Sequence, residues 1–160
     1  VRPRCRRASL KGDPVMPIGE ALLYGVIAGI VGGIAQGMLV MAYTMMARSD
    51  VLLPLKEIGA FVTRPNWETT GSAAVGLVIH MMFTAALGAA FGLLVVALNL
   101  DGLVTLAIVG MVVGLIDWVI ARFLVLPAID PVLLDVFATP MGLIGHLMYG
   151  LVLGVVFALL

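Results

Sequence analysis

Four side chains capable of hydrogen bonding or proton transfer lie inside long apolar stretches of this 160-residue chain. His80 lies within GLVIHMMFTAALGAAFGLL (residues 76–94) and His146 within GLIGHLMYGLVLGVVFALL (residues 142–160), each at the fifth position. Gln36 and Asp117 lie in two further apolar stretches. Because an ionised carboxylate is costly inside a bilayer unless it is paired, we expect Asp117 to be protonated or bonded to one of the other three.

The spacing of these residues predicts one polar layer. At about 1.5 Å of rise per residue, Gln36 lies ~16 Å and Asp117 ~15 Å from the ends of their stretches, whereas His80 lies ~12 Å and His146 ~9 Å deep. All four depths are counted from the same side of the membrane. The four side chains therefore fall within about one or two helical turns of each other in depth.

The candidate polar layer, Gln36, His80, Asp117 and His146, has three open interpretations. Hydrogen bonds among these groups can act as structural glue that fixes the register of a helix bundle. The same groups can form a small ligand or ion site, or a proton relay, since ionisable groups inside membranes are functional candidates. Alternatively, His80 and His146 bind a b-type haem or a metal in an electron-transfer membrane subunit. Arg122 is the one cation near that depth that could neutralise haem propionates.

The sequence predicts a non-enzymatic protein without a resident cofactor or metal as the main hypothesis. It contains no phosphate-binding loop, no nucleophile paired with a base and no pair of carboxylates suited to acid–base chemistry. Its formal net charge is zero, which argues against a nucleic-acid partner. The expected partner is the lipid bilayer.

The composition is that of a membrane protein, with 62% hydrophobic residues, 11% charged residues and a mean hydropathy of +1.20. Residues 21–47, 69–100 and 136–160 carry no charge, and residues 102–129 carry only Asp117 and Arg122. A helix needs about 20 apolar residues to cross a ~30 Å hydrocarbon core. We therefore predict an all-α integral membrane protein, a four-transmembrane-helix bundle with helices at about 20–47, 72–99, 102–126 and 140–160.

The two histidine segments indicate an internal repeat. At an offset of 66 residues they match at nine of nineteen positions, including His80/His146 and Phe91/Phe157. The first and third helical segments align more weakly at an offset of 81, which places Gln36 opposite Asp117. Residues 16–100 and 101–160 are thus predicted to be two tandem helical hairpins. They are parallel, because two crossings return the chain to its starting side.

Small residues recur at every fourth position on all four predicted helices, as at Gly25, Gly29 and Gly33. Such glycine stripes let helix backbones approach closely, so they mark contact faces. They predict that both imidazoles point into the bundle. They also suggest a possible homo-oligomer or a partner in a membrane complex.

The predicted orientation depends on where translation begins. Residues 1–15 are expected to be a disordered basic leader, upstream of a true start at Met16. Five cations in this leader would place the amino terminus in the cytoplasm. Without the leader, which is the preferred alternative, the first and third loops carry the remaining cations and become cytoplasmic. Each of these two loops is predicted to hold a short interfacial helix, with Trp67 as an anchor in the first.

Three segments carry a resemblance to a known family: IGHLMYGLVLGVVFALL, VIHMMFTAALGAAFGLL and GMLVMAYTMMARSDVLLPLKEIGAF. They resemble an uncharacterised family of small four-helix prokaryotic membrane proteins, a domain of unknown function with a GHLxYGLVLG-type last helix. The resemblance extends loosely over residues 20–160. It implies the four-helix fold and a multi-pass location in the bacterial inner (cytoplasmic) membrane, and it implies no activity and no functional residues.

Overall fold

The computed structural model describes residues 16–63, 68–125 and 139–160. These residues form five α-helices and one π-helical turn, namely α1 (Ile18–Arg48), α2 (Leu53–Thr63), α3 (Thr70–Leu98), α4 (Leu103–Ile120), η1 (Ala121–Val125) and α7 (Pro140–Leu159). Helices α1, α3 and α7, and α4 continued by η1, are long and apolar enough to cross a membrane. The predicted all-helical fold with four membrane spans is confirmed.

Some of the sequence-based expectations fall on residues outside the described ranges. These are the leader at residues 1–15, the anchor Trp67 and the short helix expected in the third loop. The short helix expected in the first loop is α2.

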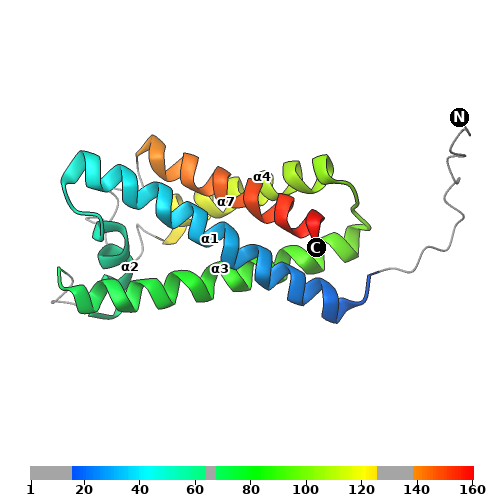
Figure 1. Cartoon of the computed structure of the whole chain (residues 1–160), viewed down its shortest axis with the longest axis horizontal. Coiled ribbons are helices and arrows are strands. Elements are labelled where there is room, and N and C mark those ends of the chain that lie inside the picture. The colour runs from blue at the N-terminus through cyan, green and yellow to red at the C-terminus, as the bar shows by residue number, and fades with distance from the viewer. Residues whose placement is uncertain (1–15, 64–67, 126–138) are drawn as a thin grey trace, which may run out of the picture.

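The helix directions place the long loops at one end of the bundle and the short turn at the other. Helix α1 begins, and α7 ends, at the end that carries the α3–α4 turn, and α2 lies at the opposite end (Figure 1). The turn is tight because Asn99 (φ 50°) and Gly102 (φ 81°) adopt left-handed backbone conformations. Asparagine and glycine tolerate this region better than other residues do.

Glycines bring the helices of each hairpin into backbone contact. A Cβ on Gly29 of α1 would lie 2.9 Å from Gly88 Cα of α3 and still closer to the Thr84 carbonyl oxygen. In the second hairpin, a Cβ on Gly150 of α7 would lie 3.0 Å from Met111 Cα of α4. Side chains larger than hydrogen cannot fit at these crossings without separating the helices. The glycine stripes therefore form contacts between helices of the same chain.

The four spans form an open arrangement with the order α3, α1, α7, α4. Helix α1 packs extensively against both α3 and α7, and α7 packs against α4. Edge-to-face aromatic rings pack between the spans toward the end that carries the α3–α4 turn, with ring centroids 5.5 Å apart for Phe91 and Phe157. In contrast, α3 and α4 barely contact each other although they follow one another in the sequence. The bundle therefore has one unsealed helix pair, that is, two neighbouring spans, α3 and α4, that do not pack against each other.

Helix α2 packs against the first turns of α3. Pro54, Leu55 and Ala60 are buried there. The Ser72 hydroxyl donates to the Lys56 carbonyl at 3.0 Å. Before the helix, the Asp50 carboxylate accepts hydrogen bonds from Lys56 Nζ at 2.8 Å and from the Leu52 amide at 2.9 Å. The ammonium of Lys56 lowers the pKa of Asp50, so this link at the start of α2 is weakened when acid protonates the carboxylate.

Cysteine labelling tests the membrane topology. Ser49 follows α1 and Asp101 lies in the α3–α4 turn, and both side chains are exposed at opposite ends of the bundle. In a chain with Cys5 replaced by serine, we expect Ser49→Cys and Asp101→Cys to react with a membrane-impermeant maleimide from opposite faces of the membrane. Labelling of both positions from the same face in intact cells would contradict four crossings.

Candidate functional site

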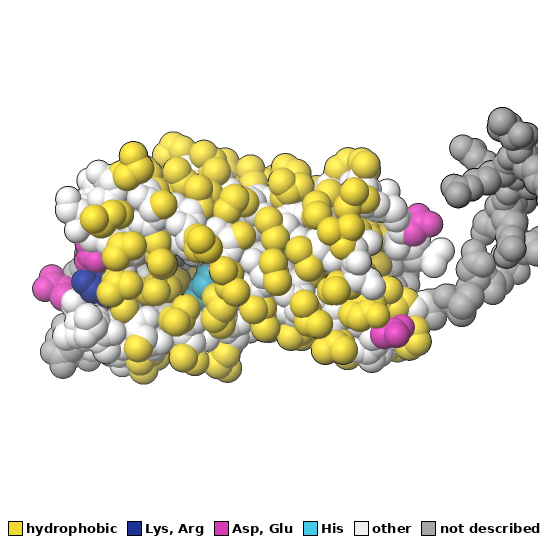
Figure 2. Space-filling view, viewed as in Figure 1, with side chains coloured by type: hydrophobic (Ala, Val, Ile, Leu, Met, Phe, Trp, Pro, Cys, Tyr) yellow, Lys and Arg dark blue, Asp and Glu magenta, His cyan; other side chains and the backbone are white. Residues whose placement is uncertain are grey.

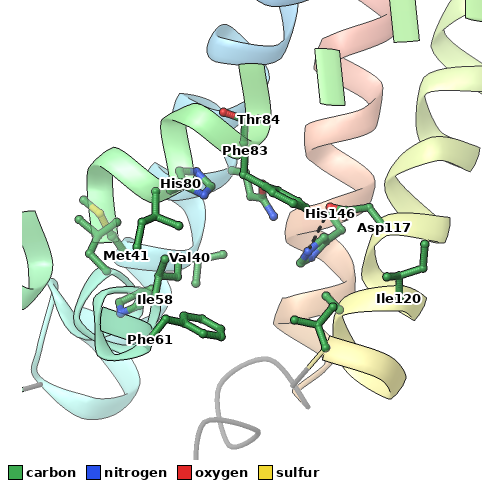
Figure 3. Close-up of a pocket in the computed structure, with 17 residues that line it drawn as sticks. Val40, Met41, Ile58, Phe61, His80, Phe83, Thr84, Asp117, Ile120 and His146 are labelled. Carbon is green, nitrogen blue, oxygen red and sulfur yellow. Dashed lines mark ion pairs between the residues drawn. The ribbon is translucent and has the colours of Figure 1, made fainter. Parts of the chain in front are cut away.

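A cavity of about 300 Å³ lies at the α2 end of the bundle, between α1, α2 and α3 on one side and α4, η1 and α7 on the other. The residues predicted to form the polar layer all line it: Gln36 from α1, His80 from α3, Asp117 from α4 and His146 from α7. Figure 3 shows His146 and Asp117 facing one another across α7 and α4, with His80 on the opposite wall. Residues from four different helices therefore meet at one site.

His146 is held in a single orientation by its own helix. Its side chain is 8% exposed, and Nδ1 lies 2.7 Å from the Gly142 carbonyl oxygen one turn earlier. Because a carbonyl oxygen only accepts hydrogen bonds, Nδ1 carries the hydrogen. The other ring nitrogen, Nε2, lies 3.7 Å from Asp117 Oδ2. This separation allows electrostatic attraction but exceeds a hydrogen bond.

His80 is held across the helix interface. Its Nε2 lies 3.0 Å from the Gly33 carbonyl oxygen of α1, so Nε2 carries the hydrogen. In the neutral ring, Nδ1 is then a hydrogen-bond acceptor. The side chain is half-buried and borders Gly37, where a Cβ would lie 3.7 Å from His80 Nε2. The two histidines thus bind carbonyl groups through different ring nitrogens.

Gln36 and Thr84 complete the polar part of the lining. The Gln36 side chain packs beside α7, where a Cβ on Gly145 would lie 3.6 Å from Gln36 Cγ. The Thr84 hydroxyl donates to the Met81 carbonyl at 3.2 Å, which leaves its lone pairs as acceptors.

Sequence reasoning missed the residue that bridges α7 and α3 beside the cavity. Tyr149 is 1% exposed and donates its hydroxyl hydrogen to the Thr84 carbonyl oxygen at 3.0 Å. The sequence did contain an indication of this role, because Tyr149 carries a phenol hydroxyl within an otherwise apolar helix, three residues after His146. A buried phenol usually has a hydrogen-bond partner.

Most of the cavity wall is apolar. It includes Val40 and Met41 of α1, Ile58 and Phe61 of α2, and Phe83 of α3 (Figure 3). The α2 residues could not be assigned to the site from sequence, since nothing in their pattern shows which helix they cover. Ala121 and Val125, at the start and end of η1, also line the cavity. Single π-helical turns are frequent at functional sites.

The cavity opens on the apolar flank of the bundle. Figure 2 shows a histidine side chain (cyan) at the bottom of a hollow surrounded by hydrophobic side chains, toward the α2 end. The charged side chains in this view gather at the two ends of the molecule. Phe83, which lines the cavity, is 56% exposed. One of the two histidines is therefore visible from the apolar flank of the bundle.

The residues present fit a haem or metal poorly in this arrangement. Within the described ranges no group of three or more His, Cys, Asp or Glu side chains could hold a metal ion. A haem bound between both histidines would use one nitrogen of each ring; in His80 the Gly33 carbonyl occupies Nε2, which leaves Nδ1, the nitrogen nearer the helix backbone. His146 Nε2 faces Asp117 instead of a second imidazole.

These features define a small multi-pass helical membrane protein with a cavity between its spans that is lined by apolar side chains and a few polar ones. The chain belongs to a Family of unknown function (DUF6789), whose family model matches residues 20–160. The predicted membership of an uncharacterised family is confirmed. No curated protein and no solved structure matches the chain significantly.

Proposed function

We propose that this protein is a membrane-embedded binding protein, not an enzyme, and that its cavity takes a small, largely apolar molecule from the bilayer. The observation that carries the proposal is the convergence of Gln36, His80, Asp117 and His146 on one cavity whose other walls are apolar. A few directed polar groups in an apolar pocket are typical of small-molecule sites. Groups serving only as glue would be expected to bond directly to one another, whereas His146 and Asp117 stand 3.7 Å apart.

Two tandem hairpin repeats, which we include in the proposal, account for the helix contacts. A Cβ on Gly88 would meet the Gly25 carbonyl oxygen, and a Cβ on Gly154 would meet the Leu106 carbonyl oxygen. These two contacts are related by the offsets of 66 and 81 that align the sequence. Gly29 and Gly110 are similarly related, and their Cβ positions would meet the carbonyl oxygens of Thr84 and Gly150.

A difference between the repeats explains why the cavity exists. Gly32 of α1 accommodates the Tyr149 ring, since a Cβ there would lie 3.0 Å from Tyr149 Cδ2. The same offsets place Val113 where the first repeat has Gly32, and Phe83 where the second has Tyr149. A valine cannot admit an aromatic ring as closely as a glycine can. Helices α1 and α7 therefore pack against each other, whereas α3 and α4 stay apart.

We place the protein in the bacterial inner membrane, on the basis of the resemblance of its last helix. Because the stripe glycines that contact neighbouring helices are used within the chain, an oligomer or a complex with another membrane protein would use other residues.

Filling the cavity tests the proposed function. Gly37 lines the cavity, and within 4 Å a Cβ there would meet only His80 Nε2, so Gly37→Leu adds bulk to the cavity without disturbing a helix crossing. Isobutylbenzene and benzyldimethylammonium serve as apolar and cationic probes, measured by equilibrium dialysis against protein in lipid nanodiscs. We expect saturable binding of at least one probe, retained in Gly37→Ala and reduced about tenfold or more in Gly37→Leu. Equal binding by Gly37→Leu and Gly37→Ala, after subtraction of empty nanodiscs, would rule the proposal out.

A further inference from the structure

The hydrogen bonds already made by the cavity side chains determine what a ligand must supply. The ring hydrogens of His146 and His80 go to the carbonyl oxygens of Gly142 and Gly33, and the Thr84 hydroxyl hydrogen goes to Met81. In the neutral rings, His146 Nε2 and His80 Nδ1 are acceptors, and an ionised Asp117 only accepts. Apart from the Gln36 amide, the polar side chains among the described lining residues therefore offer acceptors.

The charge of the site follows from its position within the membrane. A lone carboxylate is costly there, so Asp117 is neutralised either by a proton, bound to its own carboxyl group or to the imidazole of His146 3.7 Å away, or by a cation. His80 lines the same cavity, while the Tyr149 hydroxyl is bonded to the Thr84 carbonyl. The described lining residues of α1 and α2 contribute no titratable side chain. The guanidinium of Arg122 is stacked over the neighbouring phenylalanine ring, 5.4 Å from its centroid.

We infer that the ligand is a lipophilic cation: an apolar body carrying one ammonium group whose N–H donates to Asp117, beside His146 Nε2. This inference rests on the proposed function and deepens it. A charged donor satisfies a buried carboxylate better than a neutral hydroxyl does. Aromatic rings at Phe61 and Phe83 line the cavity and can contact the cation through their faces.

Binding of the cation displaces the proton. Before binding, one proton, on the Asp117 carboxyl group or on His146 Nε2, leaves the pair without net charge. When the ammonium group enters, the carboxylate pairs with it, the imidazole is neutral and the proton leaves for the aqueous phase. The charge within the membrane is therefore the same before and after binding. The site is an exchanger of one proton for one organic cation.

Two probes of nearly equal shape separate charge from size. Benzyldimethylammonium, protonated at neutral pH, and isobutylbenzene differ essentially in replacement of N–H⁺ by C–H. We expect wild-type protein in nanodiscs to bind the cation about tenfold or more tightly than the hydrocarbon, a ratio that one charge-assisted hydrogen bond supplies. A pH dye in weak buffer should report about one proton released per bound cation. Cation affinity should fall as the pH is lowered, because protons compete for the pair, while hydrocarbon affinity stays constant.

The variant Asp117→Asn removes the charge and keeps the shape. We expect it to lose the preference for the cation and the proton release, and a cooperative thermal unfolding transition in detergent shows that the variant is folded. Asp101→Asn, an equivalent change of an exposed acid in the α3–α4 turn, should change neither. Equal affinities for the two probes in wild-type protein would overturn the inference and leave the cavity as a binding site. Loss of all saturable binding in the wild type would instead overturn the proposed function.

Discussion

Gly29→Leu is expected to destabilise the protein by about 3 kcal/mol or more, because it forces α1 and α3 apart. At this crossing the obstacle is backbone: a Cβ on Gly29 would meet the Thr84 carbonyl oxygen and lie 2.9 Å from Gly88 Cα. Backbone cannot rotate away as the end of a flexible side chain can. The measurement is the thermal unfolding midpoint in detergent, followed by circular dichroism.

The equivalent position and an open position provide the controls. Gly110 faces the Gly150 carbonyl oxygen in the second hairpin, so Gly110→Leu should cost a similar amount. Gly19, on the same helix as Gly29, has no atom within 4 Å of its Cβ position, and Gly19→Leu should be neutral or stabilising because leucine favours helices. A Gly29→Leu protein as stable as Gly19→Leu would show that the α1–α3 crossing is looser than described.

The membrane spans could be predicted because each depends on a local property. The four apolar segments, of which one carries Asp117 and Arg122, are each long enough to cross the bilayer as a helix. Their length alone therefore predicts helical spans and the number of spans, without reference to the rest of the chain. Depth could also be predicted, because rise per residue is fixed in a helix. Gln36, His80, Asp117 and His146 were placed at similar depth from the sequence, and they line one cavity.

The partners of each polar side chain could not be predicted, because they depend on helix rotation and on contacts far apart in sequence. The bond from His80 Nε2 to the Gly33 carbonyl joins residues on different helices, and no side-chain pattern marks a backbone carbonyl as an acceptor. The unsealed α3–α4 pair was also not foreseen. It depends on a comparison of Val113 with Gly32 that has meaning only once Tyr149 is seen to pack against Gly32.

The second large effect is expected at Tyr149. The ring packs against Gly32 of α1, and the hydroxyl donates to the Thr84 carbonyl of α3, so this one side chain joins α7 to both helices of the first hairpin. Tyr149→Ala should therefore destabilise the protein by about 3 kcal/mol, near the lower end for loss of a buried aromatic ring. The value is at the lower end because lipid, not water, surrounds the separated helices, so lost packing dominates the cost.

Phe83 is the matched control, since it occupies the position equivalent to Tyr149 at the offset of 66 but is 56% exposed where Tyr149 is 1% exposed. More than half of the Phe83 surface is exposed both before and after the helices separate, so unfolding changes its surroundings little. Phe83→Ala should therefore change stability by less than about 0.5 kcal/mol. Tyr149→Phe keeps the ring and removes the hydrogen bond, so it should cost only about 0.5 to 1 kcal/mol. Thermal unfolding of the three variants in the same detergent is the measurement. Equal losses for Tyr149→Ala and Phe83→Ala would mean that α3 and α4 are sealed as tightly as α1 and α7, and that the cavity does not arise from a difference between the two hairpins.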